Sequence, residues 1–274
     1  MFFNKINSNF EISMAKRSEK QVMSDSHFHN AHELYYLLNG EFSYFIENAV
    51  YSVKKGDMVL IPCDVIHKTQ YKTKTNCKRI LISFSDDFIA DLKKDDPDIL
   101  GCFSQKIISL SKPKQAVAEN IMTQILNEFS GVYDPNFALV KCLFGELLIL
   151  LCRHAESAGF QKNIQFTNLT SQKIIEIVEY INQNYKEDIT LMLLSEKFFL
   201  SGAHLSKLFK SVTGFNYSEY LSNVRIKQGV DLLKNSDLNI TEIAFSVGFN
   251  SSNHFCKSFK SVIGISPLKY KKML

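Results

Sequence analysis

Two stretches decide the fold of the C-terminal part: residues 199–214 read FLSGAHLSKLFKSVTG, and residues 249–264 read FNSSNHFCKSFKSVIG. Aligned without a gap at an offset of 50 and extended to Tyr220 and Tyr270, the copies are identical at ten of 22 positions. An internal repeat means that one physical unit is used twice. We therefore predict two equivalent structural units, one around each copy.

Each copy has the pattern of an amphipathic helix with marked ends. Apolar residues recur at helical spacing, as in Leu205, Leu208 and Phe209. A serine before each helix can cap free backbone N–H groups, and a glycine after it suits the left-handed conformation that ends a helix. These residues are Ser201, Ser251, Gly214 and Gly264. We expect helices over Ser201–Lys210 and Ser251–Lys260.

A second, shorter helix precedes each of these. In residues 240–249, the small Ala244 lets two helices cross closely, and Gly248 opens the turn between them. That arrangement is typical of a helix-turn-helix, whose second helix can lie in the DNA major groove. In the first copy Ser195 and Phe199 take these places, so its turn is less typical. We place the two units at about 189–213 and 240–263.

The stretch from about Ser171 to Leu274 resembles the DNA-binding domain of AraC/XylS-family transcriptional regulators, in which a central helix bridges two helix-turn-helix units. The residues that carry the resemblance are the bridging Arg225–Leu233 and Ile243, Ala244, Gly248, Phe249, Phe255, Lys257, Phe259, Lys260, Gly264, Ser266, Pro267 and Tyr270. Two positions depart from the family: Gly229 replaces the usual Ala, which weakens the helix by up to ~1 kcal/mol, and Tyr217 replaces a common Pro. The resemblance implies promoter DNA, RNA polymerase and a small-molecule effector as partners.

The exposed sides of the two recognition helices are the predicted DNA-binding surface. Their candidate residues are Ala203, Ser206, Lys207, Lys210, Ser252, Asn253, Lys257 and Lys260. The amide of Asn253 can pair with the edge of an adenine, and Lys207 and Lys257 can contact guanine or phosphate. Residues 171–274 hold 13 Lys and Arg against 9 Asp and Glu, so the chain's net charge of +4 lies there. A basic surplus favours contact with phosphates.

Composition indicates a soluble, cytoplasmic protein. At 274 residues the chain has room for two domains. Its six cysteines lack CxxC spacing, which favours reduced thiols. It begins without a basic and apolar leader, and its most apolar run, Phe137–Cys152, is interrupted by Lys141 and Glu146. We therefore expect no membrane partner.

The N-terminal part alternates β-rich runs with turn signals. The predicted strands are Glu33–Leu38, Glu41–Ile46, Ala49–Val53 and Met58–Ile61, and the predicted helices are Lys114–Phe129 and Asn136–Arg153. The fold class is therefore α+β and multidomain, with a cupin-like β-barrel, a helical segment and an all-α double helix-turn-helix. We expect the β-domain over 1–100, a dimerisation segment over 101–156, a linker over 157–170 and the DNA-binding domain over 171–274.

Four residues of the β-domain resemble the ligand positions of the two cupin motifs: His27, His29, Glu33 and His67. Alternate residues of a strand point the same way, so His27 and His29 can both face the interior. Three imidazoles and a carboxylate suit Fe(II), Mn(II), Ni(II) or Zn(II). Alternatively they contact an organic effector, and no cofactor is then expected. Asp64 stands where the second motif usually has Gly.

Aromatic residues near these four would form walls for an effector. Tyr35 and Tyr44 offer hydroxyl groups beside apolar surface, which fits a small polar metabolite such as a sugar. His32 is interpreted as a surface or rim residue, and His204 and His254 as packed near the helix turns.

The apolar residues of Asn136–Arg153 form two stripes, and we predict that one of them makes a homodimer. One stripe contains Leu139, Leu143, Leu147 and Leu150, and the other contains Val140, Phe144 and Leu151. A helix buried entirely in its own domain is the alternative.

Three functions compete, and all include DNA binding. The first is an effector-responsive transcriptional regulator without enzymatic activity, which we favour. The second is a metal-dependent cupin enzyme with an added DNA-binding domain, but no second inward carboxylate is obvious. The third is a ligand-independent DNA-binding protein with a vestigial barrel.

Overall fold

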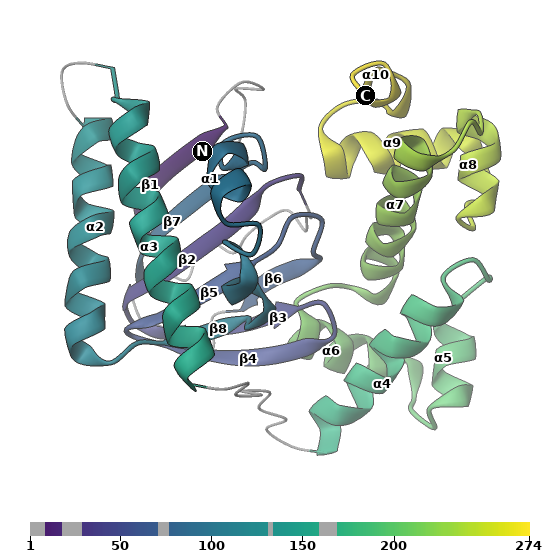
Figure 1. Cartoon of the computed structure of the whole chain (residues 1–274). Coiled ribbons are helices and arrows are strands. Elements are labelled where there is room, and N and C mark those ends of the chain that lie inside the picture. Colours follow the sequence, from purple (N-terminus) through teal and green to yellow (C-terminus); the bar gives the residue numbers. More distant parts are fainter. Residues whose placement is uncertain (1–8, 18–28, 71–76, 131–133, 159–168) are drawn as a thin grey trace.

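The computed structural model describes residues 9–17, 29–70, 77–130, 134–158 and 169–274, which form two lobes (Figure 1). The described strands are β1 (Phe10–Arg17), β2 (His32–Asn39), β3 (Glu41–Ile46), β4 (Ala49–Lys54), β5 (Asp57–Ile61), β6 (His67–Gln70), β7 (Cys77–Phe84) and β8 (Ile107–Ser109). The N-terminal lobe also contains α1 (Ala90–Asp95), the 3-10 helix η1 (Gly101–Ser104), α2 (Lys112–Ser130) and α3 (Phe137–Ala158). The C-terminal lobe contains α4 (Leu169–Asn184), α5 (Leu191–Lys197), α6 (Gly202–Thr213), α7 (Tyr217–Asn235), α8 (Ile240–Ser246), α9 (Ser252–Ile263) and α10 (Pro267–Lys271).

The strands of the N-terminal lobe form two antiparallel sheets. One has the order β1-β7-β2-β5-β8, and the other has the order β4-β3-β6. The four strands predicted from sequence correspond to β2–β5, and both predicted helices are confirmed as α2 and α3. The fold class is confirmed: a sheet-rich N-terminal lobe precedes a helical one.

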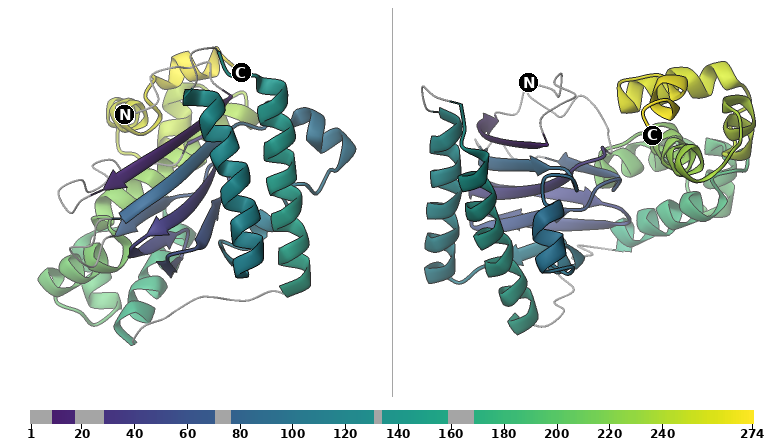
Figure 2. Two further views of the ribbon diagram at one scale, coloured as in Figure 1. Left: turned by 90° about the vertical axis from the view of Figure 1, so that its left-hand side faces the viewer. Right: turned by 45° about the horizontal axis from the view of Figure 1, so that its top comes forward.

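Strand β2 has no solvent-exposed face over most of its length, because both of its sides are covered. Leu34 and Tyr36 belong to a cluster that includes residues of α2 and α3, and these helices lie along the larger sheet (Figure 2). Tyr35 and Leu37 point the other way, into a cluster shared with β3 and β4 of the smaller sheet. The space between the two sheets is therefore a second core, and it holds the candidate effector site.

More of helix α3 is buried in its own lobe than the dimer prediction assumed. Leu143, Leu147, Phe144 and Leu151 are all buried against the sheet and α2, so both predicted stripes serve largely to close the protein's own core. The alternative of a helix covered within its own domain fits these residues. The large apolar residues of α3 that remain exposed are Phe137, Leu139 and Ile149.

The C-terminal lobe consists of two helix-turn-helix units on either side of α7. Ser201 and Ser251 cap α6 and α9 through hydrogen bonds from backbone N–H groups, and the glycines at their ends have φ angles of 83° and 88°. The predicted caps and helix ends are confirmed. The expected linker over 157–170 overlaps residues 159–168, which lie outside the described residues.

Gly229 has a packing reason that the sequence did not suggest. A Cβ atom at this position of α7 would lie 2.8 Å from Cε2 of Phe255. The glycine thus lets the ring of α9 approach the central helix closely, in exchange for helix propensity.

Candidate functional site

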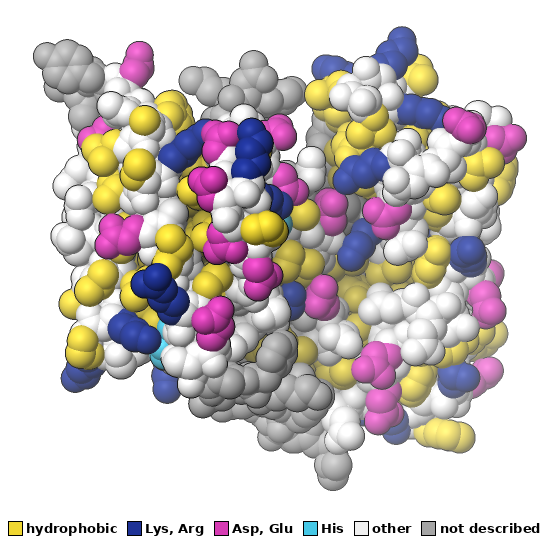
Figure 3. Space-filling model, in the orientation of Figure 1, with side chains coloured by type: hydrophobic (Ala, Val, Ile, Leu, Met, Phe, Trp, Pro, Cys, Tyr) yellow, Lys and Arg dark blue, Asp and Glu magenta, His cyan; other side chains and the backbone are white. Residues whose placement is uncertain are grey.

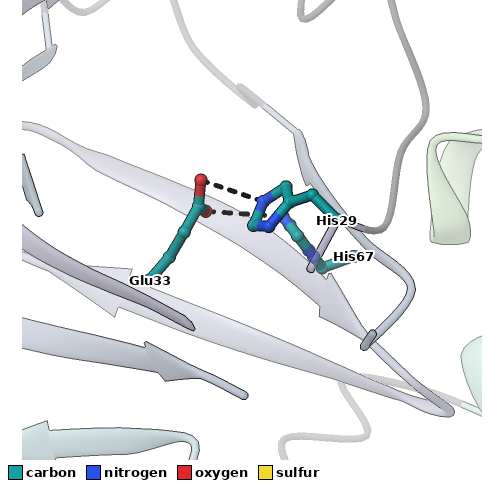
Figure 4. Close-up of side chains that lie close together, drawn as sticks. All are labelled: His29, Glu33 and His67. Atoms are coloured by element: carbon teal, nitrogen blue, oxygen red, sulfur yellow. Dashed lines mark ion pairs between the residues drawn. The ribbon is translucent and has the colours of Figure 1, made fainter. Parts of the chain in front are cut away.

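Three of the four predicted pocket residues converge at the edge of the inter-sheet core. His29 precedes β2, Glu33 lies in β2 and His67 begins β6. The Nε2 atom of His29 lies 3.1 Å from Oε1 of Glu33, and Nε2 of His67 lies 3.5 Å from Oε2 (Figure 4). The fourth residue, His27, lies outside the described residues.

Backbone carbonyl groups fix the tautomer of both imidazoles. Nδ1 of His29 donates to the carbonyl of Ala31 at 3.0 Å, and Nδ1 of His67 donates to that of Val65 at 2.7 Å. Each Nε2 atom therefore turns its lone pair, or a second proton, toward the carboxylate. Histidines that bind metals have this same arrangement, because the bond at one nitrogen orients the other toward the ion.

Electrostatics in the site favour charge on both partners. Burial by itself would lower the pKa of His29, but the Glu33 carboxylate, together with the Ala31 carbonyl and Asp64, raises it above its usual value. Burial alone would likewise raise the pKa of Glu33, yet His29 and His67 hold it well below its usual range. The site therefore stabilises a positive species next to Glu33, either a proton on the imidazole or a cation.

The donor set fits a divalent metal. Ligand atoms of His29, Glu33 and His67 all lie within 4.8 Å of one another. Two imidazoles and one carboxylate are a common ligand set for first-row metals such as Fe(II).

Both predicted aromatic residues lie inside the core. Tyr35 and Tyr44 are buried with their ring centroids 6.0 Å apart, and the Tyr44 ring lies 6.0 Å from that of His67. The sequence did not indicate Arg79 of β7, which is buried with its guanidinium 4.6 Å from the centre of the Tyr35 ring. Had β7 been recognised, its alternation would have placed Arg79 on the same face as Cys77, toward the other sheet.

The interpretation of His32 as a surface residue is wrong. This residue is 6% exposed, because its ring stacks on Phe84 and meets the edge of Phe103. Its Nδ1 accepts a hydrogen bond from the backbone N–H of Cys63, and its Nε2 lies 3.1 Å from Asp86. Burial lowers the pKa of His32, although Asp86 acts in the opposite direction.

The two recognition helices present the same face to solvent. From Ser201 to Lys210 and from Ser251 to Lys260, exposed, half-buried and buried residues follow in the same order. The exposed candidates are Ala203, Asn253, Lys207, Lys257, Lys210 and Lys260, and the half-buried ones are Ser206 and Ser252. Both lysine pairs are thus exposed at equivalent positions of α6 and α9.

Two histidines belong to this face as well. His204 and His254 are exposed, and each lies three residues before Lys207 or Lys257, so the side chains are neighbours on the helix surface. His254 also meets the ring of Phe249 in the turn at 5.2 Å, which fits part of its predicted role. The repeat was the sequence signal for these two histidines, since an exposed residue at the same place in both copies indicates a common function.

The turns of the two units differ as the sequence predicted. Gly248 has φ of 91°, and a Cβ atom there would lie 2.7 Å from the carbonyl oxygen of Lys186. In the first unit Phe199 follows Ser195 by four residues, as Gly248 follows Ala244, so it occupies the place of the turn glycine. Phe199 has φ of 54° and is 89% exposed. A left-handed conformation is costly for a residue with a side chain, so the first turn is strained.

Comparison with known proteins agrees with this architecture. Residues 194–273 match the family model described as a helix-turn-helix domain, and residues 32–163 match the ExsA N-terminal regulatory domain. The chain belongs to the AraC/XylS family of transcriptional regulators. The uncharacterised HTH-type transcriptional regulator YdeC of Bacillus subtilis is 24% identical to this regulator over 261 residues, 90% of this chain and 86% of YdeC.

Other relatives match over comparable lengths. The Msm operon regulatory protein of Streptococcus mutans is 24% identical over 269 residues, 97% of this regulator and 94% of that protein. Among solved structures, ToxT of Vibrio cholerae O395 is 18% identical with a TM-score of 0.39, covering 97% of this chain and 98% of ToxT.

The two lobes of this regulator are joined by several contacts. Tyr220 at the start of α7 donates to the carbonyl of Glu47 at 3.2 Å, and its ring lies 5.8 Å from that of Phe45. Lys68 of β6 lies 3.3 Å from the carboxylate of Glu219 and 4.6 Å from the centre of the Phe215 ring. The inter-lobe contacts thus begin next to His67 and end on the helix between the two helix-turn-helix units.

Among the described residues no helix is long and apolar enough to cross a bilayer. On the face seen in Figure 3, Lys and Arg side chains are interspersed with acidic ones over both lobes. Charge alone therefore does not mark the DNA-binding surface on this face.

Proposed function

We propose that this regulator binds promoter DNA through α6 and α9, each in the major groove, and that an effector held between the two sheets alters this binding. The observation that carries the DNA-binding proposal is the identical order of exposed and buried residues in the two helices. Two equivalent surfaces bridged by one helix suit two adjacent segments of the groove, about one turn or ~34 Å apart.

Within each helix, we assign the contacts by side-chain chemistry. Asn253 pairs with an adenine edge, Lys207 and Lys257 contact guanine or phosphate, and Lys210 and Lys260 neutralise phosphate. The short side chains of Ala203, Ser206 and Ser252 let the backbone approach the bases.

Selection of a binding site from random DNA, followed by footprinting with the full chain, tests this proposal. We expect protection of two neighbouring major-groove segments per monomer. Protection of a single segment would contradict the paired-groove arrangement.

The effector site is proposed to take a small polar metabolite that carries an acidic group, such as a sugar acid or a sugar phosphate. Tyr35 and Tyr44 supply apolar walls, while Arg79 and His29, whose pKa is raised, supply positive charge. An arginine is well suited to a carboxylate or a phosphate because its donors match two oxygens at once. This acidic group refines the sugar that the aromatic residues near the pocket suggested.

A divalent metal is the second candidate occupant. His29, Glu33 and His67 would hold it, and His27 could complete the set. The ion would neutralise Glu33 and offer open coordination positions to oxygen atoms of an effector. Metal analysis of the purified protein, and thermal shift with and without a chelator, separates the two occupants. A ligand at 100 times its Kd should stabilise the fold by about 2.7 kcal/mol.

The effector signal is proposed to reach DNA through the contacts between the lobes. His67 lies next to Lys68, which is paired with Glu219, so a shift of the β6 strand is transmitted to the start of α7. An effector can act only through a difference in affinity for two arrangements of the lobes. RNA polymerase contact and a cytoplasmic location remain part of this proposal.

The active form is proposed to be a homodimer through the outer face of α3. Leu139 and Ile149 are apolar and exposed there, at positions that fall on one side of a helix. A twofold dimer is the commonest assembly of soluble proteins. The buried Leu143 and Phe144 cannot take part, so the interface differs from the stripes expected from sequence.

A further inference from the structure

Two cysteine thiols lie together outside both sites described above. Cys102 belongs to η1 and Cys152 belongs to α3, and both side chains line the same cavity. In its thiol form Cys152 donates to the carbonyl of Ile99 at 3.3 Å. Elements that are 50 positions apart in sequence thus bring the two cysteines to one place.

The thiol pair is reachable from outside. Both cysteines line a cavity of about 260 Å³ together with Asp98, Gln105 and Glu156. Cys152 is half-buried, whereas Cys102 is almost fully buried. A small oxidant that entered the cavity would therefore meet Cys152 first, with Cys102 behind it.

The two thiols differ in acidity. Interaction with Cys102 lowers the pKa of Cys152, against the effect of burial. The same interaction, together with burial, raises the pKa of Cys102. One member of the pair is thus suited to attack as a thiolate, and the other remains a thiol until it is needed.

We propose that Cys152 and Cys102 form a redox site in which a hydroperoxide converts the thiol pair into a disulfide. The Cys152 thiolate attacks the peroxide O–O bond, which breaks to give a sulfenic acid and release an alcohol, or water from hydrogen peroxide. The Cys102 thiol then attacks the Cys152 sulfur, forms the S–S bond and releases water. Two thiols lose two electrons in total, and the peroxide gains them.

The site would act on DNA binding through its position in α3. Cys152 lies in the last two turns of this helix, after which the chain runs to the DNA-binding lobe. A disulfide would tie this end of α3 to η1, next to the existing bond from Gln105 Nε2 to the carbonyl of Ala155 at 3.2 Å. This consequence rests on the proposed function, whereas the chemistry of the site does not.

The experiment treats the full chain with one equivalent of hydrogen peroxide, blocks the remaining thiols and maps disulfides by mass spectrometry. We expect a peptide pair linked through Cys102 and Cys152. The matched control is Cys142, an exposed thiol on the same helix. Because the lowered pKa of Cys152 increases the fraction of this thiol present as thiolate, Cys152 should be modified roughly tenfold faster than Cys142.

Several outcomes would overturn the proposal. They are faster modification of Cys142 and a Cys152 sulfenic acid that never links to Cys102. A dimer joined through Cys142 would migrate at twice the mass on a non-reducing gel, and Cys142→Ser removes it without affecting the internal link. The peptide map uses the unmodified sequence, so the test does not depend on the folding of a variant at Cys102 or Cys152.

DNA binding provides the second measurement. Oxidation should change affinity for the selected DNA at least threefold, and a dithiol reductant should restore it. Unchanged affinity with the link formed would overturn the coupling to DNA. Failure of the reduced protein to bind any selected DNA would count against the proposed function, while the peptide map would still report on the redox site.

Discussion

The carboxylate of Asp64 lies 3.3 Å from the ammonium group of Lys234, and this ion pair joins the β5–β6 connection to the central helix of the DNA-binding lobe. The backbone N–H of Asp64 also donates to the carbonyl of His29 at 3.0 Å. Asp64 has φ of 59°, which explains why related motifs favour glycine at this place. One residue therefore contacts both the candidate effector site and α7.

A double-mutant cycle measures this contact. Asp64→Asn removes the charge while keeping a residue that tolerates a left-handed conformation, and Lys234→Met removes the other charge. Because both side chains are partly exposed, we expect a coupling energy of about 0.3–1 kcal/mol in urea unfolding. Additive effects of the two changes would show that the pair does not join the lobes in solution.

The strained first turn can be relieved. Phe199 is left-handed and 89% exposed, so Phe199→Gly loses little packing and removes the steric cost. Allowing for the greater freedom of glycine in the unfolded chain, we expect a gain of roughly 0.5–1 kcal/mol in unfolding free energy. Gly248→Ala is the matched change in the other unit and should destabilise by about 1–3 kcal/mol, because its Cβ meets a backbone carbonyl. A loss of stability in Phe199→Gly would mean that the exposed ring has a packing partner.

How far the sequence predicted the fold depended on whether a signal was local. Caps, glycine ends and helical periodicity lie within a few residues, so α6, α9 and the unusual Phe199 turn were all predicted correctly. Strand β7 has no such local signals at its ends, so neither the strand nor its residue Arg79 was predicted. The histidines show the same limit: motif spacing brought His29 and His67 to Glu33, but nothing local indicated that His32 is covered by Phe84.

Helix α3 shows what a sequence pattern cannot decide. It is apolar on nearly every side, so periodicity could not tell which stripe covers the sheet and which is exposed. The answer comes from the placement of α2 and the larger sheet, which is a tertiary property. The acidity of Cys152 is of the same kind, since Cys102 is 50 residues away in sequence.

The pKa values of His29 and His32 should be shifted in opposite directions, although the two residues are only three positions apart. In chelator-treated protein, the pKa of His29 should lie above 6.5 and that of His32 below it. The stability that His29 contributes is complete below its unfolded pKa and is lost as pH rises through its raised pKa. The contribution of His32 is present above its unfolded pKa and is lost as pH falls through its lowered one.

Ring signals followed by NMR across pH 4–9 check this, with His29→Gln and His32→Gln for assignment. Glu33→Gln should lower the pKa of His29. The pKa of His32 should stay nearly unchanged, because the partner of His32 is Asp86. Similar pKa values for both rings would contradict the buried carboxylate as the cause.

Lys257→Ala distinguishes base recognition from phosphate contact. If Lys257 reads a base, we expect a loss of about 1–3 kcal/mol on the selected site and a smaller loss on unrelated DNA. If it touches phosphate, both affinities fall together and the slope of log affinity against log salt drops by about one. Lys207→Ala tests the same position in the first unit, and unchanged binding at both DNA sequences would remove Lys257 from the interface.

The dimer proposal is tested by charge on the exposed face of α3. Leu139→Glu and Ile149→Glu place carboxylates where the structure shows apolar side chains in solvent, so the fold of each protomer should persist. If a second copy covers this face, burying an unpaired charge there costs several kcal/mol and should dissociate the dimer at micromolar concentration. Leu147→Glu is the matched control, because Leu147 is fully buried against the protein's own sheet and its replacement should unfold the lobe instead. Sedimentation of the unchanged protein as a monomer at micromolar concentration would rule out this interface, and a dimer that survives both exposed substitutions would place it on another surface.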